Sequence, residues 1–221
     1  MKKLFASTFA ILATSFMFNG TILAAENTAP SYAPTYNVDI HQPMVQLENK
    51  AAQKKINSYM LDFARQLPND IDEYYMKYDA VCAARLNSQV TYKNDKLISI
   101  VTDQYINMEN SAHPGVYKYC RIFSTTDGHA ISLKELSAMP EFKDKASHYN
   151  MDYIRAAIYN KYTRYLYSDR EYLANLQLPQ DVYMDQDGNV HIVIQTYEIA
   201  PYATGIIDVN LDVKEEPLNY D

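Results

Sequence analysis

The sequence predicts an α+β fold, with a mostly antiparallel sheet packed against an N-terminal amphipathic helix and a central helical segment. Apolar side chains alternate with polar ones in several runs within 86–122 and 182–213. In 49–67 and 151–166 they recur instead at steps of three and four residues. Period-two and helical patterns therefore occupy separate parts of the chain, which is typical of α+β proteins.

The first 25 residues have the pattern of a secretory signal peptide. Lys2 and Lys3 precede an apolar run from Leu4 to Phe18, and small residues follow at Ala24 and Ala25. We expect cleavage after Ala24 or Ala25 and an extracytoplasmic location, either periplasmic or secreted. Without cleavage, the uncharged stretch 4–25 would be a membrane anchor, because it is nearly long enough to span a bilayer.

The remainder is expected to form a single domain at 36–213. Residues 26–35 are polar with two prolines, which predicts a disordered spacer, and 214–221 form a tail. The chain carries 20 Lys and Arg against 27 Asp and Glu. This acidic balance argues against a nucleic-acid partner, because phosphate contacts require basic side chains.

The first elements of the domain are predicted to be a strand and a helix. Residues 36–47 alternate loosely and are interrupted by Pro43, which indicates a broken or edge strand. Asn49 can cap the helix that follows, and we expect Pro68 to end it. One face of that helix is apolar, and consists of Ala52, Ile56, Tyr59, Met60, Phe63 and Leu67.

Three alternating runs then predict an antiparallel meander. If Tyr92 faces Ile98 across the turn, Val90 faces Ile100, and the apolar faces of the two strands agree. The third strand carries Val116, Cys120 and Ile122.

This register also predicts that the two cysteines are unpaired. Cys82 and Cys120 fall on the outer strands of the meander, offset by about 20 Å along the strand direction. A disulfide requires Cα atoms within about 7 Å of each other.

The second half of the chain contains short helices and a hairpin. Ser132 and Glu135 form a capping box that starts one helix, and Ser168 and Glu171 form a second. A longer helix is expected at 151–166, and these helices should cover the sheet. The last strands are expected at 182–184, 190–197 and 206–213, with a turn at Asp187-Gly188.

The connection between the last two strands, Gln195–Gly205, contains a carboxylate, two tyrosines and a proline. It is either a functional site or a structural corner. Gly205 would release the chain into the last strand. Glu198 would accept hydrogen bonds that close the corner, or it would be an acid with a raised pKa.

The sequence holds no established catalytic or metal-binding pattern. His113 lies in a turn, where it is a backbone-binding imidazole, a ligand or a general base. No nucleophile elbow accompanies it, and the histidines lack metal-ligand spacing. We expect neither a metal nor a cofactor. An envelope hydrolase using His113 and Glu198 remains an alternative, as does a purely structural module.

Several segments in order resemble a known family of extracytoplasmic domains. They are Ile56-Asn57, Leu97–Ile100, Ala112–Pro114, Asp127–Leu136 and Asp181–Gly205. This succession resembles the C-terminal domain of unknown function of RsiV-type anti-sigma factors, which also occurs in PdaC-type peptidoglycan deacetylases. The resemblance extends from about Tyr36 to Val213.

The resemblance implies a non-catalytic binding or sensing module of the cell envelope. Its partner would be a cell-wall glycan or a wall-active protein such as lysozyme. It implies neither anti-sigma nor deacetylase activity, because those activities reside in other segments. The residues expected to touch a partner are His113, Pro114, Tyr197, Pro201 and Tyr202.

Overall fold

The computed structural model describes residues 15–16, 37–78, 82–109, 111–168 and 171–213. The predicted spacer and tail lie outside these residues, as do the cleavage positions Ala24 and Ala25. Only Ser15 and Phe16 of the predicted signal peptide are described. No helix in the described ranges is long and apolar enough to cross a bilayer.

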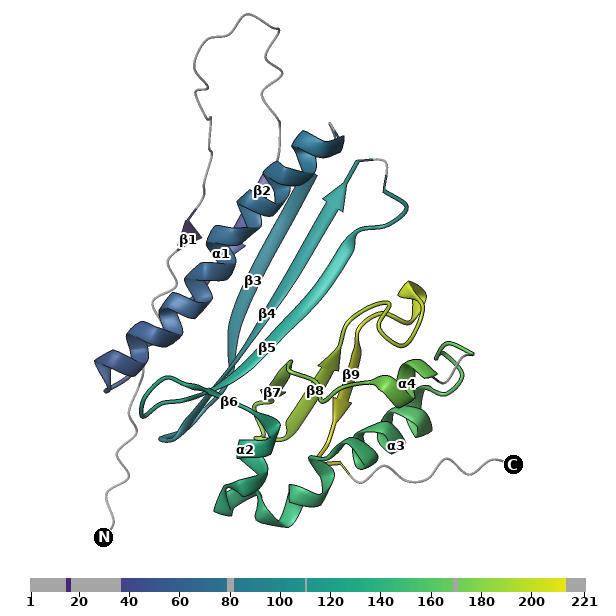
Figure 1. Cartoon of the computed structure of the whole chain (residues 1–221). Helices are drawn as coiled ribbons and strands as arrows, with labels where there is room; N and C mark the ends of the chain where they lie inside the picture. The colour runs from purple at the N-terminus through teal and green to yellow at the C-terminus, as the bar shows by residue number, and fades with distance from the viewer. Residues whose placement is uncertain (1–14, 17–36, 79–81, 110, 169–170, 214–221) are drawn as a thin grey trace, which may run out of the picture.

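Two sheets and a set of helices build the protein (Figure 1), which confirms the predicted α+β class. The larger sheet has the strand order β1-β2-β3-β4-β5-β6, and the smaller has β7-β8-β9. Neighbouring strands are antiparallel except β2 and β3, which are parallel. The strands are β1 (Ser15–Phe16), β2 (Asn37–His41), β3 (Cys82–Lys93), β4 (Leu97–Met108), β5 (Gly115–Ser124), β6 (Ala130–Ile131), β7 (Val182–Met184), β8 (Val190–Ile194) and β9 (Ile207–Asn210).

The predicted meander is present as β3, β4 and β5. Val90 faces Ile100, as the pattern indicated, but Tyr92 faces Ser99 rather than Ile98. The register shifts between Val90 and Tyr92. A bulge with one extra residue on β3 explains this shift, and a strict period-two pattern cannot predict it.

The backbone register keeps the two cysteines on opposite sides of β4. Cys82 lies across from Met108, whereas Cys120 lies across from Val101. Cys120 is a free, buried thiol. Burial, followed by the negative charge of Asp181, raises the pKa of Cys120 far above its ordinary value. The thiol therefore stays protonated and packs as a small apolar side chain.

Helix α1 (Lys50–Tyr78) begins where the sequence predicted. The Asn49 side chain accepts hydrogen bonds from the backbone N–H groups of Ala51 and Ala52 at 2.9 and 3.1 Å. This is the geometry of an N-cap, which satisfies donors that the helix leaves free.

The predicted end of this helix at Pro68 is wrong, because α1 continues to Tyr78. Leu67 and Ile71, one turn apart, are both buried and pack in one cluster with Ala84 and Leu86 of β3. Burial of Ile71, which lies beyond the proline, therefore outweighs the backbone hydrogen bond that a proline removes.

Four short helical segments follow the larger sheet and lie beside the smaller one (Figure 1). They are α2 (Leu133–Ala138), η1 (Pro140–His148), α3 (Met151–Tyr162) and α4 (Glu171–Asn175). Ser132 and Glu135 form the predicted capping box. Helix α3 ends at Tyr162, four residues before the predicted end at Leu166. The described part of α4 begins at Glu171, and 169–170 of the second predicted capping box lie outside the described residues.

The larger sheet is covered on both faces. Ile56 and Met60 of α1 pack on Ile98, Ile100 and other side chains of one face. On the other face, buried side chains of β4 and β5 meet the smaller sheet, as in the cluster of Val101, Cys120 and Val193. The largest cluster lies between the smaller sheet and helices α2, η1 and α3. The sheet expected from sequence is thus divided into two sheets that pack against each other.

The last two strands are shorter than predicted. β8 ends at Ile194 rather than Tyr197, and β9 covers Ile207–Asn210 rather than 206–213. Tyr197 has a φ of 70°, in the left-handed region that strands do not use. The chain therefore leaves the sheet before Tyr197 and builds a separate loop.

Candidate functional site

A cluster of three aromatic rings forms where two distant segments meet. His113 comes from the β4–β5 connection, and Tyr197 and Tyr202 come from the loop between β8 and β9. The Nε2 atom of His113 lies 2.6 Å from the hydroxyl of Tyr197. The rings of His113 and Tyr202 stack with centroids 3.6 Å apart and an interplanar angle of 13°. We call His113, Tyr197 and Tyr202 the aromatic cluster.

The residues that the sequence proposed for binding belong to the aromatic cluster or directly adjoin it in the chain. Pro114 follows His113 and is half-buried, and its carbonyl oxygen lies 3.1 Å from Nδ1 of the imidazole. Pro201 is exposed and precedes the short helix η2 (Tyr202–Thr204). His113 thus makes the backbone contact that the sequence predicted, and it also contacts the hydroxyl of Tyr197, which the sequence did not predict.

The conformation of the 195–205 loop depends on two unusual backbone positions. Tyr197 adopts a φ of 70°, which is rare and costly for a residue with a side chain. Gly205 has φ 75° and ψ −164°, a region essentially limited to glycine. The loop is thus held in a defined shape that presents Tyr197 to solvent with 52% of its surface exposed.

Gln195 attaches this loop to the outer edge of β5. The short strand β6 pairs with the same edge further along, at Ile122 and Phe123. The Oε1 atom of Gln195 accepts from the N–H of Lys118 at 3.1 Å, and its Nε2 donates to the carbonyl of Lys118 at 2.8 Å. Asp181 accepts from the N–H of Cys120 at 2.8 Å on the same edge. Nε2 of Gln195 also donates to Asp181 at 3.2 Å. Side chains that directly flank β7 and β8 thus take the place of a neighbouring strand here.

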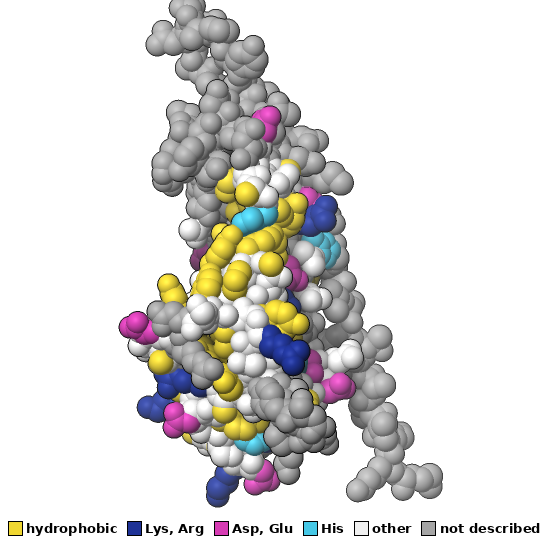
Figure 2. Space-filling model, turned by 90° about the vertical axis from the view of Figure 1, so that its right-hand side faces the viewer, with side chains coloured by type: hydrophobic (Ala, Val, Ile, Leu, Met, Phe, Trp, Pro, Cys, Tyr) yellow, Lys and Arg dark blue, Asp and Glu magenta, His cyan; other side chains and the backbone are white. Residues whose placement is uncertain are grey.

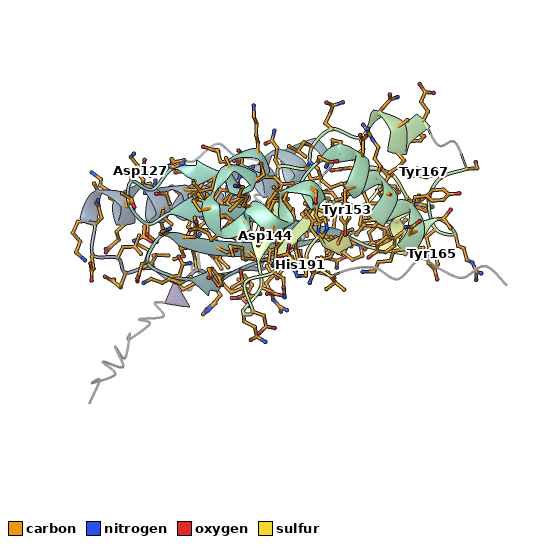
Figure 3. The ribbon with its side chains drawn as sticks, turned by 90° about the horizontal axis from the view of Figure 1, so that it is seen from below. Asp127, Asp144, Tyr153, Tyr165, Tyr167 and His191 are labelled. Atoms are coloured by element: carbon orange, nitrogen blue, oxygen red, sulfur yellow. The ribbon has the colours of Figure 1, made fainter. Side chains whose placement is uncertain are left out.

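The other side of the loop is bound to the segment between α3 and α4. The N–H of Tyr167 donates to the carbonyl of Ile199 at 3.1 Å. The hydroxyl of Thr204 donates to the carbonyl of Tyr165 at 3.4 Å. Figure 3 shows Tyr165 and Tyr167 close together at the end of the molecule that bears α4. Anchors on both sides fix the aromatic cluster relative to the sheets.

The region around the loop exposes several large apolar side chains. Tyr165 and Tyr172 are 59% and 53% exposed, comparable with Tyr197. Figure 2 shows hydrophobic side chains gathered on the side of the molecule that carries these loops, with a histidine among them. Aromatic side chains with a polar atom are suited to recognition, because they offer apolar area together with a hydrogen-bonding group.

Glu198 enters a different environment from its neighbour Tyr197. It lines a cavity of about 890 Å³ between α1, β5 and the α4 region. Partial burial raises the pKa of Glu198, and a hydrogen bond from the backbone of Gln195, a contact within the corner, acts in the other direction. The negative charge of Asp181 adds to the effect of burial, and the pKa of Glu198 is raised overall.

Sequence reasoning did not find the polar cluster around His191. Nδ1 of His191 lies 2.8 Å from Asp208, and Nε2 lies 3.2 Å from Asp185. The hydroxyl of Tyr183 donates to Asp208 at 2.8 Å. Figure 3 shows His191 well separated from Tyr165 and Tyr167. Burial alone would lower the pKa of His191, but the hydrogen bonds and charges of Asp208 and Asp185 raise it overall.

The His191 cluster is fully occupied by its own hydrogen bonds, and we interpret it as structural. Within the described ranges no group of three or more His, Cys, Asp or Glu side chains is arranged to hold a metal ion. The sequence signal for this cluster is faint. In β8, His191 occupies the same face as buried Val193, opposite Ile192 and Ile194.

Comparison with known proteins adds a family model and two fold relatives. The model of DUF3298, a protein family of unknown function, matches residues 142–214. A DUF3298 protein from Pseudomonas aeruginosa PAO1 is 13% identical, with a TM-score of 0.54 over 91% of this chain and 88% of that chain. A DUF3298 protein from Bacteroides fragilis NCTC 9343 is 13% identical, with a TM-score of 0.55 over 93% and 90%. Curated proteins gave no match. At these identities the likeness concerns the fold.

Proposed function

We propose that this protein is an exported, non-catalytic binding module of the cell envelope, and that the aromatic cluster is its recognition surface. The observation that carries the proposal is the meeting of His113 with Tyr197, at a sequence separation of 84 residues, and with the more distant Tyr202. A surface that only needs to be soluble does not require an exposed tyrosine in a strained backbone conformation. Such strain concentrates at functional sites.

The compartment and the partner class come from the sequence. The signal-peptide pattern of the first 25 residues supports export. The resemblance to the extracytoplasmic domain of RsiV-type anti-sigma factors and PdaC-type deacetylases supports a wall glycan or a wall-active protein such as lysozyme as the partner. The DUF3298 match at 142–214 includes Tyr197 and Tyr202.

The arrangement of the loop favours binding over acid–base catalysis. Tyr197 bonds to His113, whereas Glu198 lines the cavity beside α1, and His113 is not one of the described residues that line it. An acid and a base that share a reaction must both reach the reacting atoms. We therefore assign His113 to positioning and contact rather than to proton transfer.

The proposal is tested by measuring how the full chain binds soluble muropeptides and lysozyme by calorimetry. Tyr202→Ala should weaken binding of the true partner at least tenfold, the loss expected of an aromatic residue at the centre of an interface. The matched control is Tyr153→Ala, because Tyr153 stacks on His148 with centroids 4.2 Å apart, much as Tyr202 stacks on His113.

Retained affinity in the Tyr153 variant and lost affinity in the Tyr202 variant would support the aromatic cluster. Equal losses in both would point to a general effect on folding and would contradict the assignment. Failure of the unaltered chain to bind either class of partner would overturn the proposed function.

A further inference from the structure

A cavity lies beside the loop that carries Tyr197 and Glu198. Its walls come from α1, β5, α4 and the segment that leads into β7, and its volume is about 890 Å³. Aromatic side chains contribute much of the lining, namely Tyr59, Phe63, Tyr119 and Tyr172. The volume is in the range of cavities that hold a side chain or a small ligand. We call this cavity the α1–α4 groove.

Acidic side chains outnumber basic ones in the lining of the groove. Arg121 is the one cation among its described lining residues, against Glu171, Asp181 and Glu198. Arg121 is already engaged, because its guanidinium donates to the carbonyls of Cys120 and Gln180 and contacts Asp181 at 3.5 Å. Its charge is therefore directed at the groove wall rather than at a ligand.

The carboxylates of Asp181 and Glu198 differ in the hydrogen bonds and charges that surround them. Asp181 accepts from the N–H of Cys120 and from the side chain of Gln195. Glu198 accepts a backbone hydrogen bond but has no ion-pair partner among the described salt bridges. Although Glu198 remains solvent-exposed, partial loss of water and repulsion by Asp181 both disfavour its negative charge. A cation placed beside Glu198 would relieve both effects.

We propose that the α1–α4 groove accepts a lysine or arginine side chain of a partner protein, with Glu198 as its counter-ion. The aliphatic part of such a side chain would lie against the aromatic wall, and its charged end would reach Glu198. Aromatic faces attract cations, and long basic side chains bury their stems on apolar surfaces. This inference rests on the proposed binding function and specifies the partner as a basic protein.

The charge of the whole chain agrees with this choice. The formal net charge is −7, so a basic protein would be attracted over a distance before contact. A neutral glycan would also stack on the tyrosines and could donate hydroxyl hydrogen bonds to Glu198, but it carries no positive charge to offset that of the carboxylate. The charge of Glu198 therefore separates the two partner classes.

The test uses octalysine as the probe and its fully N-acetylated form as the uncharged control, titrated into the full chain by calorimetry. The salt concentration is kept near 0.15 M, so that contacts between distant charges are screened. Octalysine should bind, and the acetylated peptide should bind at least tenfold more weakly. Glu198→Gln should weaken octalysine binding about tenfold, as expected for a charge-assisted contact. Tyr172→Ala should weaken it severalfold.

The matched control is Glu48→Gln, which removes the same charge from an exposed position outside the groove. It should change octalysine affinity by less than about twofold. Equal effects of Glu48→Gln and Glu198→Gln would show diffuse attraction and would overturn the groove as a site. A chitooligosaccharide that binds with an affinity sensitive to Tyr172→Ala but not to Glu198→Gln would overturn the basic partner in favour of a glycan.

This test is separable from that of the proposed function. Tyr202→Ala should leave octalysine binding unchanged, because Tyr202 is not a lining residue of the groove. Loss of partner binding in the Tyr202 variant with unchanged octalysine binding would support both sites. If the unaltered chain bound no envelope partner but still bound octalysine through Glu198, the proposed function alone would fail.

Discussion

Replacing Gln195 by alanine should destabilise the protein more than the loss of an ordinary surface side chain would. Gln195 makes paired hydrogen bonds of 3.1 and 2.8 Å with the N–H and the carbonyl of Lys118, on a stretch of the outer edge of β5 that none of the described strands pairs with. Each bond contributes about 1 kcal/mol, and leaving half-buried backbone groups unpaired adds to the loss. We expect the free energy of unfolding to fall by about 2–3 kcal/mol.

The assay is urea unfolding followed by circular dichroism, since the chain contains no tryptophan. A loss of this size should lower the melting temperature by about 4–12 °C for a domain of this length. Gln177→Ala is the control, because Gln177 is exposed and makes one local bond of 3.0 Å to the carbonyl of Asn175. It should cost less than about 0.5 kcal/mol. Equal stabilities of the two variants would refute the role of Gln195 as a substitute for a strand.

Three further predictions concern charge, backbone and the aromatic cluster. Burial opposes the charge on His191, but the hydrogen bond and charge of Asp208 outweigh burial, so the pKa of His191 is raised in the folded state. His191 therefore stabilises the fold fully below its unfolded pKa of about 6.5, and this contribution is lost as the pH rises through the folded pKa. The stability difference between the unaltered chain and His191→Gln should therefore shrink as the pH rises above about 6.5 and through the raised pKa of the folded state in urea titrations, and a constant difference would contradict the assignment. Gly205→Ala should cost about 1–3 kcal/mol through its backbone alone, because no atom beyond the adjoining residues lies within 4 Å of the added carbon. An unchanged melting temperature would argue against the strained corner. Tyr197→Phe removes the hydroxyl 2.6 Å from His113 and should cost about 0.5–1 kcal/mol, and no loss in the same urea assay would show that water replaces this bond.

Local patterns were sufficient for much of the fold. The capping residues Asn49 and Ser132 and the pairing of Val90 with Ile100 follow from sequence, because they depend on neighbours along one helix or one hairpin. The predicted end of α1 was wrong because Ile71 packs on β3, and a contact between distant segments leaves no local pattern in the sequence. Packing against β3 therefore extended the helix past Pro68, although a proline favours the end of a helix.

The candidate site shows the same limit. His113, Tyr197 and Tyr202 were selected by their unusual contexts and by a resemblance, and the fold brings them together. Gln195 was not selected, because a glutamine at the end of a strand carries no local signal of the edge it will cover. Glu198 was singled out, but its place beside the α1 aromatics depends on how helix and loop pack. The sequence alone does not show which distant segments lie next to each other in the folded protein.

The separation of 84 residues between His113 and Tyr197 has a thermodynamic consequence. Neither segment alone holds the aromatic cluster, so a ligand of the cluster binds the native state and gains nothing from the unfolded chain. Mass action then links occupancy to folding: at a hundredfold excess over its Kd, a ligand adds about 2.7 kcal/mol to the unfolding free energy. A rise in melting temperature therefore reports recognition even by a ligand of unknown identity. Molecules from the envelope can be screened by thermal shift, with Tyr202→Ala as the variant in which the shift disappears.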